Sequence, residues 1–243
     1  MAQITKLENQ FKLRQFPSGI PEGLTRCLKL LKSGEWEQEV EGLELLNSLA
    51  QQAPQALINE EKQVRNQLLL QIKNLRSQVT RSACQCAATL FLHLGRDMEP
   101  DLEKVVRELL VKSSDTNKFI RSDAMIALEV MAENVSVNKA VLTMFNLGRD
   151  NKSPVIRTNM TKIIDIVITR LGAERLMGSS EELQEAIFKE GSKLLTDGSL
   201  DVRQHAKHMW SEISEHQNTG KLLEKYLEPG ELRAVNKVLD GLH

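Results

Sequence analysis

One arginine-centred motif recurs four times along this chain, and its spacing limits the possible folds more than any other feature. The copies occupy residues 78–81, 118–121, 154–157 and 200–203, so their arginines are 40, 36 and 46 residues apart. Apolar or small side chains follow each arginine at three, six or seven, and ten residues, which is the spacing of one buried helical face. Another apolar stretch precedes each copy. The repeating unit is therefore expected to be a helix, a short turn and a second helix, about 40 residues in all.

A second residue recurs in the expected turns. An Asp or Asn lies six residues before three of the four arginines, whereas Leu75 stands at this place in the first copy. The period and this spacing resemble HEAT repeats, in which stacked repeats let each turn Asp meet an Arg of a neighbouring repeat. The resemblance implies a structural ladder made by Asp115, Arg121, Asn151, Arg157, Asp197 and Arg203.

Flanking segments extend the array. Residues 23–32 and 36–50 predict a helix pair before the four copies, and residues 219–227 and 231–242 predict a shorter pair after them. The sequence therefore predicts an all-α solenoid of six HEAT-like helix pairs without a β-sheet. A single domain is expected over residues 21–243, preceded by an N-terminal arm or cap over residues 1–20.

Charge and composition exclude several classes of partner. The 243 residues contain 32 Lys and Arg against 33 Asp and Glu, a net charge of -1, which argues against duplex nucleic acid or an anionic membrane as a bulk partner. No apolar run is long enough for a membrane span, and the first residues lack the apolar core of a signal peptide. Cys27, Cys84 and Cys86 are therefore expected to be reduced thiols of a cytoplasmic protein.

The sequence offers little for catalysis. It contains no H-E-x-x-H, phosphate-binding or nucleophile-elbow motif, so no enzyme activity and no cofactor are expected. His205 and His208 share a helical face and could hold a metal, but a solvated or packing pair is favoured because no further ligand completes the set.

A tryptophan in the first expected turn suggests a binding surface. Trp36 follows Gly34 and precedes an acidic helix start, and Lys and Arg occur in later turns of the same edge. An exposed Trp beside basic residues is typical of an interface hot spot. The alternative, a Trp packed on its own repeat as a hydrophobic staple, is about equally compatible with the sequence.

Two of the turn sequences resemble those of a known family. Residues 34–43 place Trp36 between acidic residues and ahead of a helix with inward Val and Leu, which is similar to the first-turn signature of TOG domains. Residues 75–84 resemble the second-repeat turn of the CLASP branch. The chain most resembles TOG domains of the Crescerin group, which regulates axonemal microtubules, and the resemblance covers nearly the whole chain.

The resemblance implies a non-enzymatic domain that binds the tubulin heterodimer or the microtubule through its turns and regulates microtubule polymerisation. It implies that Trp36 inserts into an apolar site on β-tubulin, while basic residues of later turns meet the acidic tubulin surface. The implied contact residues are Trp36, Arg76, Ser77, Gln78, Val79, Asn117, Lys118, Lys152 and Ser153.

The fifth turn departs from this family pattern. Gly198, Ser199 and Leu200 stand where the family often has a Lys or Arg for α-tubulin. Arg203 follows but is set apart as a doubtful contact, because the ladder can already hold it. The resemblance further implies a monomeric domain of a larger multi-TOG chain, located at the cytoskeleton of the cytoplasm and in cilia or axonemes.

Two other functions are compatible with helical repeats. A HEAT scaffold would bind a protein or peptide in the groove between helices, and a TOG-like domain that has lost tubulin binding belongs beside it. An enzyme or nucleic-acid repair module built on HEAT-like helices would need a basic concave face and a catalytic carboxylate or aromatic pocket. The sequence shows no such cluster. The exposure of Trp36 would distinguish the tubulin-binding hypothesis from the scaffold hypothesis.

Overall fold

The computed structural model describes residues 13–241, which divide into two compact units at Val135 and Ser136. Every regular element within residues 13–241 is helical, and six helix pairs can be followed there, three in each unit. The predicted all-α class and the HEAT-like pairing are therefore confirmed. The structure divides into these two units, and the single domain expected over residues 21–243 remains a prediction.

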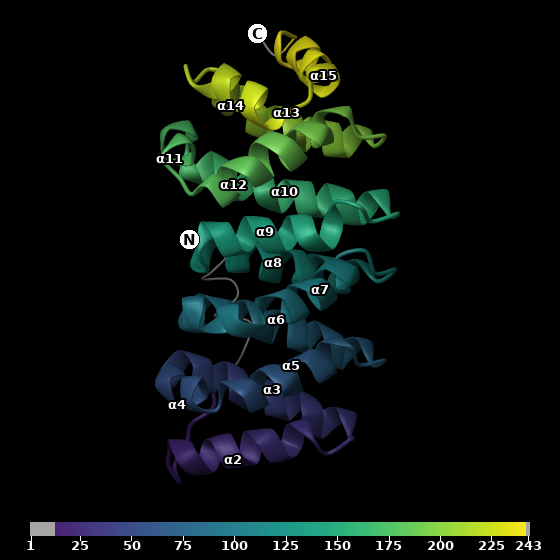
Figure 1. Ribbon diagram of the computed structural model, residues 1–243. Helices are drawn as coiled ribbons and strands as arrows, with labels where there is room; N and C mark the ends of the chain where they lie inside the picture. Colours follow the sequence, from purple (N-terminus) through teal and green to yellow (C-terminus); the bar gives the residue numbers. More distant parts are fainter. Residues whose placement is uncertain (1–12, 242–243) are drawn as a thin grey trace. The chain divides into compact units, whose positions relative to one another are not determined.

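Unit 1 contains the first three pairs in two layers (Figure 1). The second helix of each pair packs on the second helix of the next, and the first helices form the other layer. The turns inside the pairs lie along one edge of the unit. The elements are α2 (Ile20–Leu31), α3 (Trp36–Gln52), α4 (Pro54–Asn59), α5 (Glu61–Ile72), α6 (Ser77–Leu94), η1 (Gly95–Asp101), α7 (Leu102–Lys112) and α8 (Lys118–Asn134).

Unit 2 contains the other three pairs. Helix α10 packs on α9 and α13, and α13 packs on α15. The first helix of the middle pair is irregular, because α12 continues as one turn of π-helix and then as a 3₁₀ turn. The elements are α9 (Val137–Gly148), α10 (Pro154–Leu171), α11 (Ala173–Met177), α12 (Glu181–Glu185), η2 (Ala186–Gly191), η3 (Leu194–Thr196), α13 (Leu200–Ser214), α14 (Thr219–Tyr226) and α15 (Pro229–Leu239).

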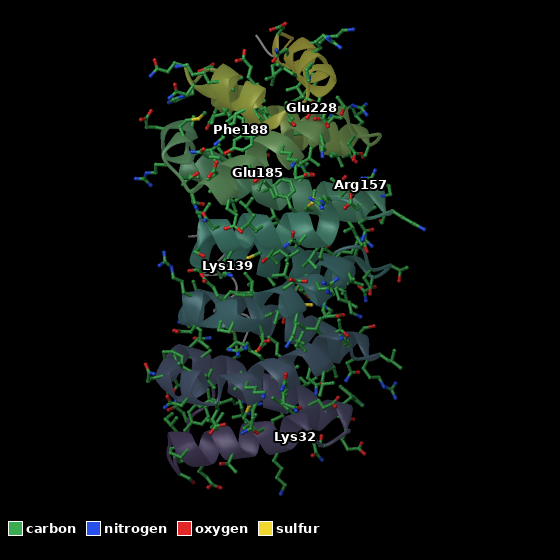
Figure 2. The ribbon with its side chains drawn as sticks, in the orientation of Figure 1. Lys32, Lys139, Arg157, Glu185, Phe188 and Glu228 are labelled. Atoms are coloured by element: carbon green, nitrogen blue, oxygen red, sulfur yellow. The ribbon has the colours of Figure 1, made fainter. Side chains whose placement is uncertain are left out.

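Aromatic and close backbone contacts fill the core of unit 2. The ring of Phe188, labelled in Figure 2, meets the buried ring of Trp210 edge-on with the centroids 5.5 Å apart. Gly148 lies so close to α10 that a Cβ atom there would come 2.8 Å from the side chain of Met160. Glycine at this position thus permits α9 and α10 to pack closely.

The described part of the N-terminal arm lies against α3. The backbone N–H of Arg14 donates to Ser48 Oγ at 3.0 Å, and Gln52 Nε2 donates to the carbonyl of Arg14 at 2.8 Å. Phe16 occupies the space beside Gly23, where a Cβ atom would come 2.3 Å from its ring. Residues 1–12 of the expected arm lie outside the described residues. Within residues 13–241, no helix combines the length and the apolar character that crossing a membrane requires.

Candidate binding edge at the intra-repeat turns

The second helices α3, α6, α8, α10 and α13 each begin after a turn that its own side chains close. A side-chain oxygen two residues before the N-cap accepts the N–H of the N-cap residue, which is the geometry of an Asx turn. The acceptors are Asn74 at 2.9 Å from Arg76 N, Asp115 at 2.8 Å from Asn117 N, Asn151 at 2.9 Å from Ser153 N and Asp197 at 2.7 Å from Ser199 N. Ser33 Oγ accepts from Glu35 N at 3.2 Å in the first turn.

The recurrent arginines close these turns from the other side. Arg121 Nη1 donates to the carbonyls of Asp115 and Thr116 at 2.8 and 2.9 Å. Arg157 Nη1 and Arg203 Nη1 likewise donate to the Asx carbonyls of their own turns at 2.8 and 2.7 Å. Each arginine lies four residues after an N-cap, so one turn of helix brings its guanidinium back over the turn.

One arginine also reaches the next turn of its unit. Arg157 Nε donates to Asp197 Oδ2 at 2.8 Å, and Nη2 donates to Oδ1 at 3.0 Å, which makes a bidentate pair. Both side chains are largely buried, with exposed fractions of 18% and 14%. The hydrogen bond from Arg157 holds the pKa of Asp197 below its ordinary value. Figure 2 labels Arg157 near the turn end of α10.

The first copy of the motif is in a different register from the one expected. Thr80, not Arg81, lies four residues after the N-cap Arg76, and its hydroxyl donates to the carbonyl of Asn74 at 2.8 Å. Arg81 instead turns toward α8, where its Nε donates to Asp123 Oδ2 at 2.8 Å. Alignment on Arg81 was therefore wrong by one residue, because Asn74 rather than Leu75 closes this turn.

The structure places most of the expected contact residues on the turn surface. Trp36 starts α3 with 41% of its surface exposed, so it is not packed away on its own repeat. Val79 is different, because it is fully buried in the core as the third residue of α6 and cannot touch a partner from there. Exposed members are Arg76, Ser77, Gln78, Lys118 and Lys152, and partly exposed members are Asn117, Ser153 and Arg203.

Sequence reasoning missed an apolar component of these turns. An exposed apolar side chain stands at each of the four later turns, within two residues of the helix start: Leu75, Phe119, Val155 and Leu200. Leu75 is 99% exposed. These residues fall outside the buried stripe of each helix, and this off-stripe position was the available signal. We call the turns before α3, α6 and α8 the turn edge of unit 1.

A shallow hollow separates the first two turns of this edge. Its volume is about 430 Å³, and Trp36, Leu75, Arg76 and Lys73 are among the residues that line it. At its floor, Asn74 Nδ2 donates to the buried carboxylate of Glu39 at 2.9 Å. The hollow therefore combines an aromatic wall and an apolar wall with both cationic and carboxylate groups, since Glu35 and Glu39 also line it.

The two histidines singled out from the sequence meet one carboxylate. His208 Nδ1 lies 2.8 Å from Asp165 Oδ1 and His205 Nδ1 lies 3.5 Å from Oδ2, so both rings are turned to one carboxylate. No cluster of three His, Cys, Asp or Glu residues in residues 13–241 could hold a metal ion. Burial raises the pKa of the Cys27 and Cys84 thiols to about 12, so these thiols are poor nucleophiles.

A family model and two relatives match most of this chain in sequence. The family model described as CLASP N terminal matches residues 40–227. The mouse protein named TOG array regulator of axonemal microtubules protein 1 is 30% identical over 219 residues, which cover 90% of this chain and 12% of that protein. The Crescerin-like protein che-12 of Caenorhabditis elegans is 28% identical over 217 residues, which cover 89% of this chain and 17% of that protein. The chain thus spans only a small part of either relative.

Solved structures share its fold. A TOG domain of Crescerin, which uses a TOG domain array to regulate microtubules in the primary cilium, matches with a TM-score of 0.63 at 16% identity, covering 92% of this chain and 90% of that chain. A TOG domain whose tubulin binding specificity promotes microtubule dynamics and mitotic spindle formation matches with a TM-score of 0.60 at 14% identity, covering 98% and 95%.

Proposed function

Because this chain belongs to the CLASP N-terminal family of TOG domains, we propose that it binds the tubulin heterodimer through its intra-repeat turns and regulates microtubule polymerisation without catalysis. The family resemblance drawn from residues 34–43 and 75–84 is thereby confirmed. The relatives are named as microtubule regulators, which supports tubulin as the partner.

The exposure of Trp36 carries the proposal. Trp36 has 41% of its surface exposed to water. Burying this apolar surface against a partner would favour binding. The place of Trp36 beside the hollow of about 430 Å³ gives a partner loop an aromatic surface to pack on. Exposed Arg76 and Lys118 on the same edge favour an acidic partner, and tubulin is strongly acidic as a class.

The fifth turn modifies this proposal. Leu200 is 59% exposed at the start of α13, and Arg203 donates to the carbonyls of its own turn at 2.7 and 3.1 Å. The turn therefore presents an apolar rather than a cationic group. We place the charged part of the proposed interface on the turns that carry Arg76, Lys118 and Lys152, and we assign Arg203 to the closure of its turn.

A binding measurement on the whole chain tests this function. The wild type is expected to form a complex with purified tubulin heterodimer in gel filtration, and Trp36→Ala is expected to weaken it by about 30- to 1,000-fold, the usual cost of removing a hot-spot tryptophan. Leu13→Ala is the control, because Leu13 is exposed to a similar degree on the N-terminal arm. No complex with wild type would reject tubulin as the partner, whereas equal binding by Trp36→Ala would reject the turn edge.

The names of the relatives also suggest where the protein works. We propose that it is part of a longer multi-TOG chain at microtubules of cilia or axonemes, since the mouse relative is named for axonemal microtubules and this chain covers 12% of its length. The full-length protein is expected to co-localise with axonemal tubulin in ciliated cells, and staining confined to structures without microtubules would contradict the proposal.

A further inference from the structure

Phe119 is an aromatic residue on the turn edge that the family resemblance does not account for. It is the second residue of α8, and 53% of its surface is exposed. The N–H of Phe119 donates to the Asn117 side chain at 2.9 Å, which holds its backbone in the first turn of the helix. More than half of the Phe119 surface therefore stays accessible to a partner.

Two cations are held against this ring. The guanidinium carbon of Arg81 lies 5.0 Å from the ring centroid, and Lys118 Nζ lies 5.1 Å from it. Both distances are in the range of cation–π interactions. Phe119 therefore presents an apolar ring bordered by positive charge.

The arginine in this group is fixed by its own ion pair. Arg81 Nε donates to Asp123 Oδ2 at 2.8 Å, and Gln85 Nε2 donates to Asp123 Oδ1 at 3.1 Å. Asp123 is buried, with 7% of its surface exposed, whereas the Arg81 side chain keeps 34% exposed. The guanidinium is thus anchored on one side and open to a partner on the other. Such an arrangement limits the side-chain entropy that binding would otherwise cost.

We propose that Phe119 is a second aromatic anchor of the partner interface, and that it receives an apolar side chain of tubulin flanked by a carboxylate. The inference rests on the proposed function and adds this residue to it. Charge complementarity supports this choice of partner group. Arg81 and Lys118 border the ring, so an apolar side chain on the ring would place a neighbouring carboxylate beside these cations. Trp36 and Phe119 belong to the first and third turns of unit 1, about 20 Å apart at one helix-pair spacing per repeat, so one flat protein surface can reach both.

The test compares four variants of the whole chain for binding to purified tubulin heterodimer. Phe119→Ala is expected to lower affinity by about 30-fold or more, as loss of a hot-spot aromatic does. Phe119→Tyr keeps the ring and is expected to bind within about twofold of wild type. Leu13→Ala is the matched control off the edge, and Trp36→Ala reports on the proposed function itself. The urea midpoint of each variant is measured alongside, and Phe119→Ala is expected to leave it nearly unchanged because the ring is exposed.

The outcomes separate the two proposals. Weakening by Trp36→Ala with no loss in Phe119→Ala would overturn the inference and leave the proposed function in place. No loss in either variant, or no binding by wild type, would overturn both. A fall in the urea midpoint of Phe119→Ala that is large enough to explain its weaker binding by unfolding would show that the ring stabilises the fold. This result would also overturn the inference.

Discussion

Arg157 shows how a single side chain can join two turns of unit 2. It bonds to the carbonyl of Asn151 in its own turn and to the carboxylate of Asp197 in the next. Because both partners of the ion pair are largely buried, Arg157→Ala leaves the Asp197 charge without its main donor. We expect a loss of about 2–4 kcal/mol in the free energy of unfolding, near the lower part of the range for broken buried pairs.

Urea unfolding measures this loss, and the chain supplies a matched control. Arg107 pairs with Glu103 at 2.6 Å along one exposed helical face, with both side chains 55% exposed. Exposed pairs of this kind contribute less than about 1 kcal/mol. Equal unfolding free energies for Arg157→Ala and Arg107→Ala would show that the buried pair adds nothing to stability.

His208 makes the stability of unit 2 depend on pH. The hydrogen bond to Asp165, then the charge of that carboxylate, raises the pKa of His208 above its ordinary value of 6.5. Protonated His208 therefore stabilises the folded state fully below pH 6.5, and this contribution disappears as pH rises through the higher folded pKa. Glu212 on α13 adds a further negative charge that raises the pKa of His208. The Asp165 carboxylate on α10 also meets His205 Nδ1 at 3.5 Å and accepts a hydrogen bond from Thr169.

Thermal unfolding between pH 5.5 and 8 checks this sign. The stability difference between wild type and His208→Gln is expected to be largest at pH 5.5 and to shrink toward pH 8. Asp165→Asn removes the charged partner and should abolish the same pH-dependent difference. A gap between wild type and His208→Gln that widens as pH rises would contradict the assignment.

Among the helices, those with a strong buried stripe could be predicted from sequence, and irregular ones could not. The helix expected over residues 36–50 is present as α3, Trp36–Gln52, because Leu43, Leu46 and Leu49 recur on one face. The last helix begins earlier than expected, at Pro229, where the side chain of Glu228 forms a capping box with Glu231. The short α4 and the π-helical turn η2 were not predicted, since neither has enough length to show a period.

At the turns, the residue types could be predicted from the sequence, but their register could not. Three Asx–arginine pairs could be aligned from spacing alone. The turn before α6 instead uses Asn74 and Thr80, a pair of different chemistry. The prediction of Val79 as a contact residue was wrong for the same reason, because a helix that begins at Ser77 turns its third residue inward. Periodicity also cannot decide whether an apolar residue at a helix start, such as Phe119, faces the core or the solvent.

The corrected register yields a prediction for α6. Thr80→Val keeps the shape of the side chain but removes the hydroxyl that donates to the Asn74 carbonyl. We expect a loss of about 1–2 kcal/mol in unfolding free energy, since Thr80 is buried and the carbonyl loses its partner. Thr25→Val is the control, because its hydroxyl donates to the Pro21 carbonyl in an exposed position. Urea unfolding that ranks the two variants equally would contradict the role of Thr80.

For the whole chain, the proposed interface combines apolar and charged contacts that respond differently to salt. The double variant Lys118→Ala with Lys152→Ala should weaken tubulin binding mainly at low ionic strength, because exposed charges are screened within about 8 Å near 0.15 M salt. Trp36→Ala should weaken it at every salt concentration, because its contribution is apolar burial. Affinities measured from 0.02 to about 0.3 M salt distinguish the two, and equal salt dependence would contradict this division.

The closure of each turn by its own residues has a consequence for how such domains diverge. Asp197, Ser199 and Arg203 bond to one another in the fifth turn, and Arg157 of the preceding turn also bonds to Asp197. The exposed Leu200 side chain takes part in none of these bonds. The outward residue can therefore be exchanged during evolution or by engineering while the backbone that carries it keeps its shape. A family built on this arrangement can change its choice of partner one side chain at a time, without passing through unfolded intermediates.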